Sequence, residues 1–159
     1  MSDFSPRFLA DYAVPSFNIE TVDLVFDLDD TKTKVTSTLA ITRQGEHKEA
    51  LVLNGEHLTL LSVEIDKEIM TPADYELSEN TLTLPVEQDS FTLKVITEID
   101  PLNNTALEGL FMSGGAFCTQ CEAEGFRRIT YYLDRPDVMA VFTTTVIADK
   151  SKFPFLLAN

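Results

Sequence analysis

Apolar and polar residues alternate along most of the chain with a period of two. In the segment 22–28 the even positions are apolar, while Asp23 and Asp27 fall on the opposite face. The segment 34–42 places Val35, Leu39 and Ile41 on one face and threonines opposite, after an intervening turn rich in Asp, Thr and Lys. Alternation of this kind is typical of β-strands with one buried face. The pattern therefore predicts a long, half-buried antiparallel hairpin.

Shorter segments continue the β-pattern, separated by turn sequences such as Asn54-Gly55 and Asp100-Pro101. We find no amphipathic helix of useful length, and expect one short helical turn near 134–137, where Pro136 suits a first turn. The prediction is a single all-β domain over residues 1–159, an antiparallel sheet or sandwich with little helix. The shorter predicted strands are 50–53, 59–65, 81–85, 91–99 and 142–147.

Two regions depart from the regular pattern. The segment 103–128 is rich in Gly, Ala and Glu, and Ser113-Gly114-Gly115 predicts an irregular loop, which we expect to be the most mobile part of the chain. The segment 153–159 has the pattern of a hydrophobic terminal strand. A strand at this place suggests that the chain is one domain of a longer protein.

The chain is strongly acidic, which disfavours some classes of binding partner. It carries 26 Asp and Glu against 12 Lys and Arg, for a formal net charge of -14. This balance disfavours binding to nucleic acid or to an anionic membrane surface. The start does not resemble a signal peptide, and no apolar run approaches the roughly 20 residues of a membrane helix. We therefore expect a cytoplasmic location.

Cys118 and Cys121 form a Cys-x-x-Cys motif. A redox function would require a thioredoxin-like βαβ context, whereas the surrounding pattern is β. A structural zinc site would require four ligands, and the chain adds only His47 and His57, both in contexts that predict exposed turns. We favour the interpretation that Cys118 and Cys121 are small residues that pack beside a loop. A redox or zinc function is the least favoured interpretation.

Gln120 and Glu122 stand out because they are two residues apart. In an extended segment both side chains would point to the same side. A carboxylate and an amide oxygen that converge there would suit a protonated amine, which needs one charge-assisted bond and a neutral acceptor. The same spacing is common on solvent-exposed strands, so the residue types alone leave both interpretations open. Tyr131 to Pro136 is interpreted as a structural corner in which aromatic packing and an Asp–Arg pair could position a loop.

Three blocks in the second half of the sequence match a known family. They are 104–110, 118–128 and 129–138, and the match extends to the early hairpin and to the segments 147–150 and 153–157. On these residues the chain resembles the amino-terminal domain of bacterial aminopeptidase N, in the gluzincin family of zinc aminopeptidases. The resemblance covers essentially the whole chain.

The resemblance implies a four-part enzyme in which this chain is the first part, a saddle-like β-domain. It implies that a loop of this domain grips the free α-amine of a peptide substrate through Gln120 and Glu122. The implied zinc cofactor belongs to the parent protein, since the family's His-Glu-x-x-His motif and its Gly-Ala-Met-Glu-Asn segment are absent here. This chain is then expected to hold no catalytic residue and no metal ligand, and to be inactive alone.

The expected partners are the N-terminus of a peptide substrate and the missing catalytic domain. A free-standing β-sandwich that binds a protein partner is the alternative from another functional class. The two differ in whether the gene continues beyond residue 159 into a His-Glu-x-x-His segment.

Overall fold

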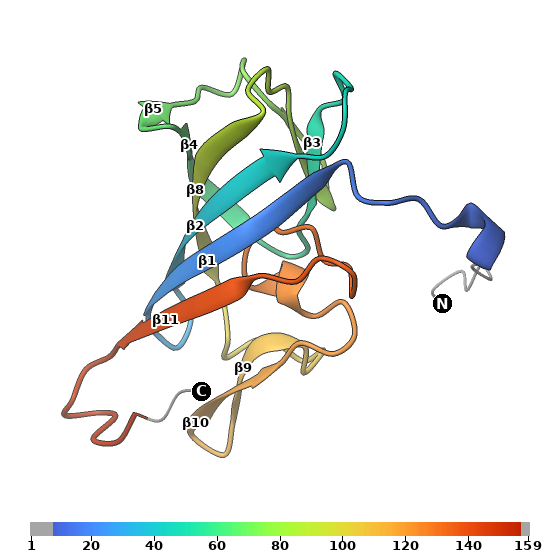
Figure 1. The fold of residues 1–159 in the computed structure, drawn as a ribbon. Helices are drawn as coiled ribbons and strands as arrows, with labels where there is room; N and C mark the ends of the chain where they lie inside the picture. The colour runs from blue at the N-terminus through green and yellow to red at the C-terminus, as the bar shows by residue number, and fades with distance from the viewer. Residues whose placement is uncertain (1–7, 157–159) are drawn as a thin grey trace.

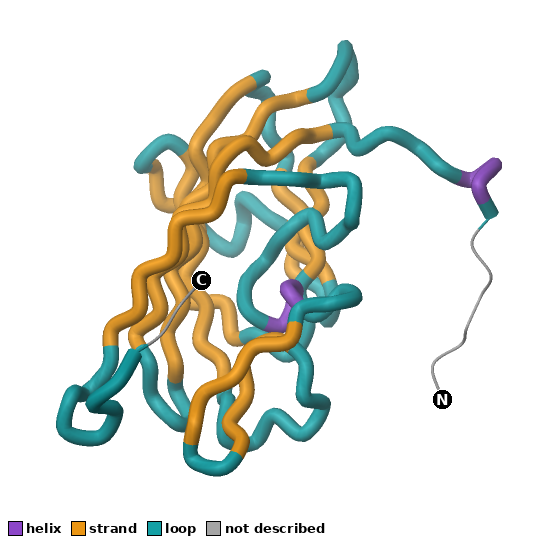
Figure 2. The backbone as a smooth tube through the Cα atoms, turned by 60° about the horizontal axis from the view of Figure 1, so that its bottom comes forward, coloured by secondary structure: helices purple, strands orange, loops and turns teal. Residues whose placement is uncertain are grey.

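The computed structural model describes residues 8–156, and nearly all the regular structure in this range is β-strand (Figures 1 and 2). Two short 3-10 turns, η1 (Leu9–Asp11) and η2 (Phe126–Arg128), are the helical elements among these residues. The all-β prediction is confirmed. The strands are β1 (Phe17–Asp27), β2 (Thr33–Arg43), β3 (Leu51–Asn54), β4 (Thr59–Ile65), β5 (Glu68–Ile69), β6 (Glu76–Leu77), β7 (Thr81–Leu84), β8 (Ser90–Ile99), β9 (Gly109–Ser113), β10 (Ala116–Gln120) and β11 (Val141–Ile147).

The strands form three sheets. The largest is six-stranded in the order β11-β1-β2-β8-β4-β5, beside a three-stranded sheet β3-β7-β6 and the two-stranded hairpin β9-β10. All pairs are antiparallel except β1 with β11, which run parallel. Parallel neighbours need a long connection, and the chain between β1 and β11 supplies it. Figure 1 shows β11 lying along β1 at the edge of the large sheet.

The alternating pattern produces one core shared by the two larger sheets. Val22, Leu39, Leu93 and Ile65 face one another across four neighbouring strands, and all four are buried. The small sheet contributes its own buried leucines to the same cluster, which makes the arrangement a sandwich. These leucines are Leu51, Leu53, Leu82 and Leu84.

The segment 103–128 contains more regular secondary structure than predicted, whereas its expected mobility stays a prediction. It contains the hairpin β9-β10, whose turn places Gly114 at φ 58° and Gly115 at φ 82°. Two consecutive residues at positive φ are the requirement of a tight hairpin turn, and glycine meets it without a steric penalty. The prediction of an irregular loop at these glycines was therefore wrong, because they terminate one strand and start the next.

Two further predictions of local structure were wrong. Residues 153–156 are not in a strand: the Lys152 and Phe153 amides both donate to the Asp149 carbonyl, and Pro154 has no amide to donate. Residues 157–159 lie outside the described range. The segment 134–137 is a turn, and the helical turn occurs earlier, at η2. No helix in the described range is long and apolar enough to cross a membrane.

Gly55 gives a test of the packing between the small sheet and the segment after η2. A methyl group at Gly55 would overlap the buried ring of Tyr131. We expect Gly55→Ala to lower the free energy of unfolding by about 1–3 kcal/mol, as overpacked cores do. Chemical denaturation would measure it. Gly114→Asn is the matched control, because position 114 faces open space and Asn tolerates positive φ; an equal loss in both variants would contradict the packing argument.

The raised pKa of Tyr132 should make the folded protein less stable at alkaline pH. Burial, and to a lesser extent the charge of Asp134, raise the pKa of its hydroxyl from 10.0 to about 12. The unfolded chain therefore loses this proton at lower pH than the folded chain, so stability falls as pH rises above 10. We expect Tyr132→Phe to lose less stability than the native chain between pH 8 and pH 11. Parallel denaturation curves at the two pH values would test this, and equal losses would contradict it.

Candidate functional site

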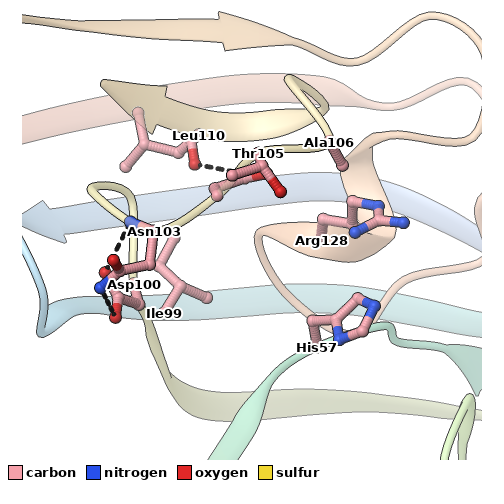
Figure 3. A pocket seen from close by; sticks show the side chains of 9 residues that line it. His57, Ile99, Asp100, Asn103, Thr105, Ala106, Leu110 and Arg128 are labelled. Carbon is pink, nitrogen blue, oxygen red and sulfur yellow. Dashed lines mark hydrogen bonds between the residues drawn. The ribbon is translucent and has the colours of Figure 1, made fainter. Parts of the chain in front are cut away.

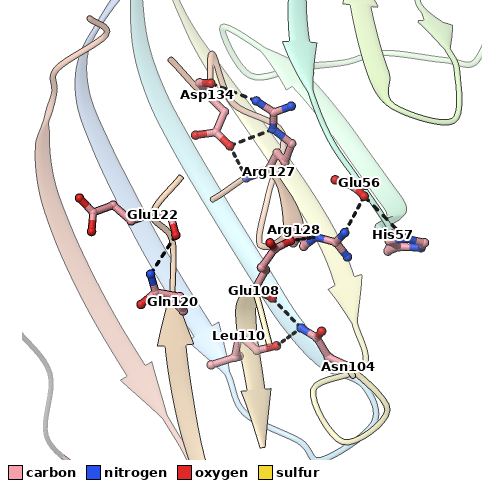
Figure 4. Close-up of polar contacts among 10 residues, drawn as sticks. All are labelled: Glu56, His57, Asn104, Glu108, Leu110, Gln120, Glu122, Arg127, Arg128 and Asp134. Atoms are coloured by element: carbon pink, nitrogen blue, oxygen red, sulfur yellow. Dashed lines mark hydrogen bonds and ion pairs between the residues drawn. The ribbon is translucent and has the colours of Figure 1, made fainter. Parts of the chain in front are cut away.

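Strand β10 ends at Gln120 and leads into the turn 121–125, which carries Glu122 (Figure 4). The Gly125 amide donates to the Cys121 carbonyl at 2.9 Å and closes this turn. The Gln120 side-chain amide donates to the Glu122 main-chain carbonyl at 2.9 Å. Local hydrogen bonds thus hold the end of β10 and the turn together, and η2 follows directly in the chain.

The extended geometry assumed for Gln120 and Glu122 was wrong, because Glu122 lies in the turn and not on the strand. Both residues are exposed, but the Glu122 carboxylate extends away from the Gln120 amide in Figure 4. What lies near the Gln120 nitrogen is the main chain of Glu122. This bond uses the donor end of the amide and leaves its oxygen as an acceptor.

Acidic groups surround the turn. Glu122 and Glu124 lie in the turn and Asp134 lies beside it. Arg127 already pairs with Asp134 at 3.0 Å and with Glu124 at 3.4 Å, and the next arginine, Arg128, pairs with Glu56 and Glu108. The local balance of charge is negative and favours a cationic ligand over an anionic one. The Asp134–Arg127 pair is a feature that sequence reasoning missed. It expected Asp134 to pair within its own corner, where Arg135 instead binds Asp137.

On the other side of η2, Arg128 lies between two carboxylates. Its guanidinium contacts Glu56 at 2.6 Å and Glu108 at 3.0 Å. The Asn104 side-chain amide donates to the carbonyls of Glu108 and Leu110, so this cluster fixes the start of β9 (Figure 4). A cavity of about 310 Å³ opens beside it. Figure 3 shows Arg128 and His57 on one side of this cavity and Ile99, Asp100 and Asn103 on the other. With Arg128 paired to two carboxylates, the cavity offers little attraction to an anion.

Cys118 and Cys121 are both free thiols, on β10 and just after it. Burial, assisted by the charge of Asp134, raises the pKa of the Cys121 thiol. A reactive thiol requires the opposite shift, usually at the start of a helix. The structure therefore disfavours a redox function for Cys121. The interpretation of the two cysteines as packing residues stays a prediction, since Cys121 is exposed and Cys118 only half-buried.

The histidines are placed apart from the cysteines. The ring of His47 is half-buried against Phe17, and its Nε2 lies 2.8 Å from the Ser16 carbonyl oxygen, so the prediction of an exposed turn was wrong for this residue. His57 is exposed beside Glu56, as predicted. The described residues contain no group of three or more His, Cys, Asp or Glu side chains that could hold a metal ion. These residues therefore do not fit a zinc centre.

Comparison with known proteins shows the family to which the chain belongs. The peptidase M1 N-terminal domain family matches residues 15–159. Aminopeptidase N of Escherichia coli is 54% identical over 153 residues, which cover 96% of this chain and 17% of that protein. The chain thus spans less than a fifth of the length of this relative.

Solved structures agree with the family match. The crystal structure of Legionella pneumophila aminopeptidase A in complex with aspartic acid has a TM-score of 0.88 and 32% identity, covering 96% of this chain and 18% of that chain. An M1 zinc metallopeptidase from Deinococcus radiodurans shares the fold, with a TM-score of 0.71 and 14% identity over 84% of this chain and 32% of its own. The resemblance noted in the sequence is confirmed: the chain belongs to the peptidase M1 N-terminal domain family.

Proposed function

We propose that the parent protein is a zinc aminopeptidase that removes residues from the N-terminus of peptides, and that this domain binds the substrate's α-amine through Gln120 and Glu122. The observation that carries the proposal is the hydrogen bond at the end of β10, which joins the Gln120 amide to the main chain of Glu122 and leaves the amide oxygen and the exposed Glu122 carboxylate as acceptors. Membership of the M1 family supports the reaction class.

The hydrogen bond of Gln120 makes chemical sense in this role. Because its Nε2 donates to the Glu122 carbonyl, the amide is fixed with its oxygen available to a ligand. An ammonium group has donors and no acceptor, so it would bind this oxygen and the Glu122 carboxylate, and the carboxylate would supply the charge-assisted bond. Glu122 would act by charge pairing and not by proton transfer.

The remaining parts of the enzyme would lie elsewhere in the parent. Since the described residues offer no set of metal ligands, we assign the zinc ion and the hydrolytic groups to the rest of that protein. This chain alone is then inactive. A cytoplasmic location fits the free thiols of Cys118 and Cys121, which persist in a reducing compartment.

The edge of the large sheet is a suitable docking face for the missing catalytic domain. Strand β11 is the outermost strand, and its apolar residues Val141, Phe142 and Ile147 are 70%, 47% and 50% exposed. Met139, just before it, is 82% exposed. Apolar side chains gathered on an edge strand favour coverage by another part of the protein. The same face would suit the alternative, a free-standing interaction module, but the family match favours the aminopeptidase.

The first test compares this chain with a version that continues into the rest of the parent. We expect hydrolysis of an alanyl or leucyl arylamide by the longer protein with zinc, and none by residues 1–159. Activity of the short chain would contradict the assignment of zinc to the rest of the parent. Silence of both would favour the interaction module.

The second test removes the proposed charge partner of the α-amine. In the longer protein, Glu122→Ala should lower kcat/KM for an aminoacyl arylamide by roughly 30-fold or more, since a charged hydrogen bond of about 2 kcal/mol is lost. Glu87→Ala, which removes an exposed carboxylate in the loop between β7 and β8, is the control. Near-native kinetics of Glu122→Ala would exclude the anchoring role.

A further inference from the structure

Arg127 connects the turn 121–125 to the body of the domain. Its Nε and its main-chain amide both donate to one oxygen of Asp134, at 3.0 and 3.1 Å. One terminal nitrogen donates to the Asp134 carbonyl at 3.1 Å and also lies 3.4 Å from the Glu124 carboxylate. The Arg127 and Asp134 side chains are only 19% and 13% exposed. The Arg127 guanidinium thus contacts both Glu124 in the turn and Asp134.

Asp134 is itself fixed to the small sheet. Its main-chain amide donates to the side-chain oxygen of Asn54 at 3.3 Å, and Asn54 ends β3. Asn54 also exchanges two main-chain hydrogen bonds with Tyr132. A continuous series of contacts therefore runs from a buried strand through Asp134 and Arg127 to the turn that carries Glu122.

The conformation of the turn gives Arg127 something to stabilise. Glu124 adopts φ 66°, in the left-handed region that a residue with a side chain rarely occupies. Gly125 packs so closely on the end of β10 that a Cβ there would lie 2.6 Å from the Gln120 carbonyl oxygen. Glu122 lies in the chain between Gln120, on which Gly125 packs, and Glu124. A contact that holds Glu124 therefore holds the main chain on which Glu122 and the Gln120 amide depend.

We propose that Arg127 is a positioning residue for the α-amine site: it holds the turn 121–125 so that the Gln120 oxygen and the main chain that carries the Glu122 carboxylate remain where the amine binds. This inference rests on the proposed function of Gln120 and Glu122. Arg127 does not itself bind the substrate, since its charge is directed to Asp134 and Glu124. Lysine cannot replace it, because an ammonium lacks the planar fork that reaches a carboxylate and a carbonyl together.

The experiment uses the full-length parent enzyme and four variants: Arg127→Lys, Glu122→Gln, the double variant, and Arg43→Lys. Arg43 is the matched control, because it is a buried arginine at the end of β2 that contacts Asp89 and the Val86 carbonyl, away from the turn. We expect Arg127→Lys to lower kcat/KM roughly tenfold, since misplacing a binding group weakens the transition state. We expect Arg43→Lys to lower the melting temperature and leave kcat/KM unchanged.

The double variant separates positioning from general destabilisation. If Arg127 acts through Glu122, Arg127→Lys has little further effect once Glu122→Gln is present, because coupled residues are not additive. Native kinetics of Arg127→Lys, or an effect that adds in full to that of Glu122→Gln, would overturn the inference. Near-native kinetics of Glu122→Gln alone would instead overturn the proposed function, and the inference with it.

Glu124→Gln keeps the test decisive if Arg127→Lys does not fold. This variant leaves the Arg127–Asp134 pair in place and weakens the contact of Arg127 with the turn. We expect a smaller loss of kcat/KM than for Arg127→Lys, again without effect in the Glu122→Gln background. Native kinetics of Glu124→Gln would count against positioning through this contact.

Discussion

The short bridge between Asn54 and Tyr132 is the interaction on which the arrangement of the site depends. Each residue's amide donates to the other's carbonyl, at 2.8 and 3.0 Å, and so joins the end of β3 to the chain that follows η2. Both neighbours of this bridge are buried: Leu53 on β3, and Tyr131 against Gly55. Buried main-chain groups need partners, so the bridge satisfies four of them at once and fixes the register of an otherwise irregular segment. The contacts that hold the segment 120–134 start at this bridge and continue through Asp134 to Arg127.

Aromatic packing supports the same segment from the other side. Phe126 on η2 makes edge-to-face contacts with Tyr132 at 4.8 Å and with Phe142 on β11 at 5.7 Å. Such contacts are stabilising and directional, because the edge of one ring meets the face of the next. Through them η2 is held between the irregular segment and the edge of the large sheet. The chain that follows the hairpin β9-β10 is therefore held by aromatic contacts at η2, and the hairpin itself extends from the rest of the domain (Figure 1).

The sequence predicted the sheets well and the site's geometry poorly, for one physical reason. A period of two needs only burial on one face, so Val22, Leu39 and Leu93 identify their strands without knowledge of their partners. The parallel pairing of β11 with β1 and the Arg127–Asp134 pair depend on how distant segments meet, and no local pattern encodes that. Gln120 and Glu122 were found through family resemblance, while the extended geometry assumed for them failed because Glu122 begins a turn.

That failure changes the argument for an amine site. On a strand, two acceptors would face one ligand through spacing alone, and a neighbouring amide could rotate to present either its donor or its acceptor. In the turn, the Glu122 carbonyl occupies the donor end of the Gln120 amide, so the orientation of the acceptor follows from a hydrogen bond. The main chain that carries the carboxylate is held separately, since its strained residue, Glu124, contacts Arg127. A turn held in this way keeps the Gln120 oxygen ready for an ammonium group before it arrives, which reduces the ordering cost of binding, while the exposed Glu122 carboxylate has only its own side chain to rotate toward the ligand. The local excess of acidic groups adds attraction for that cation without adding a contact.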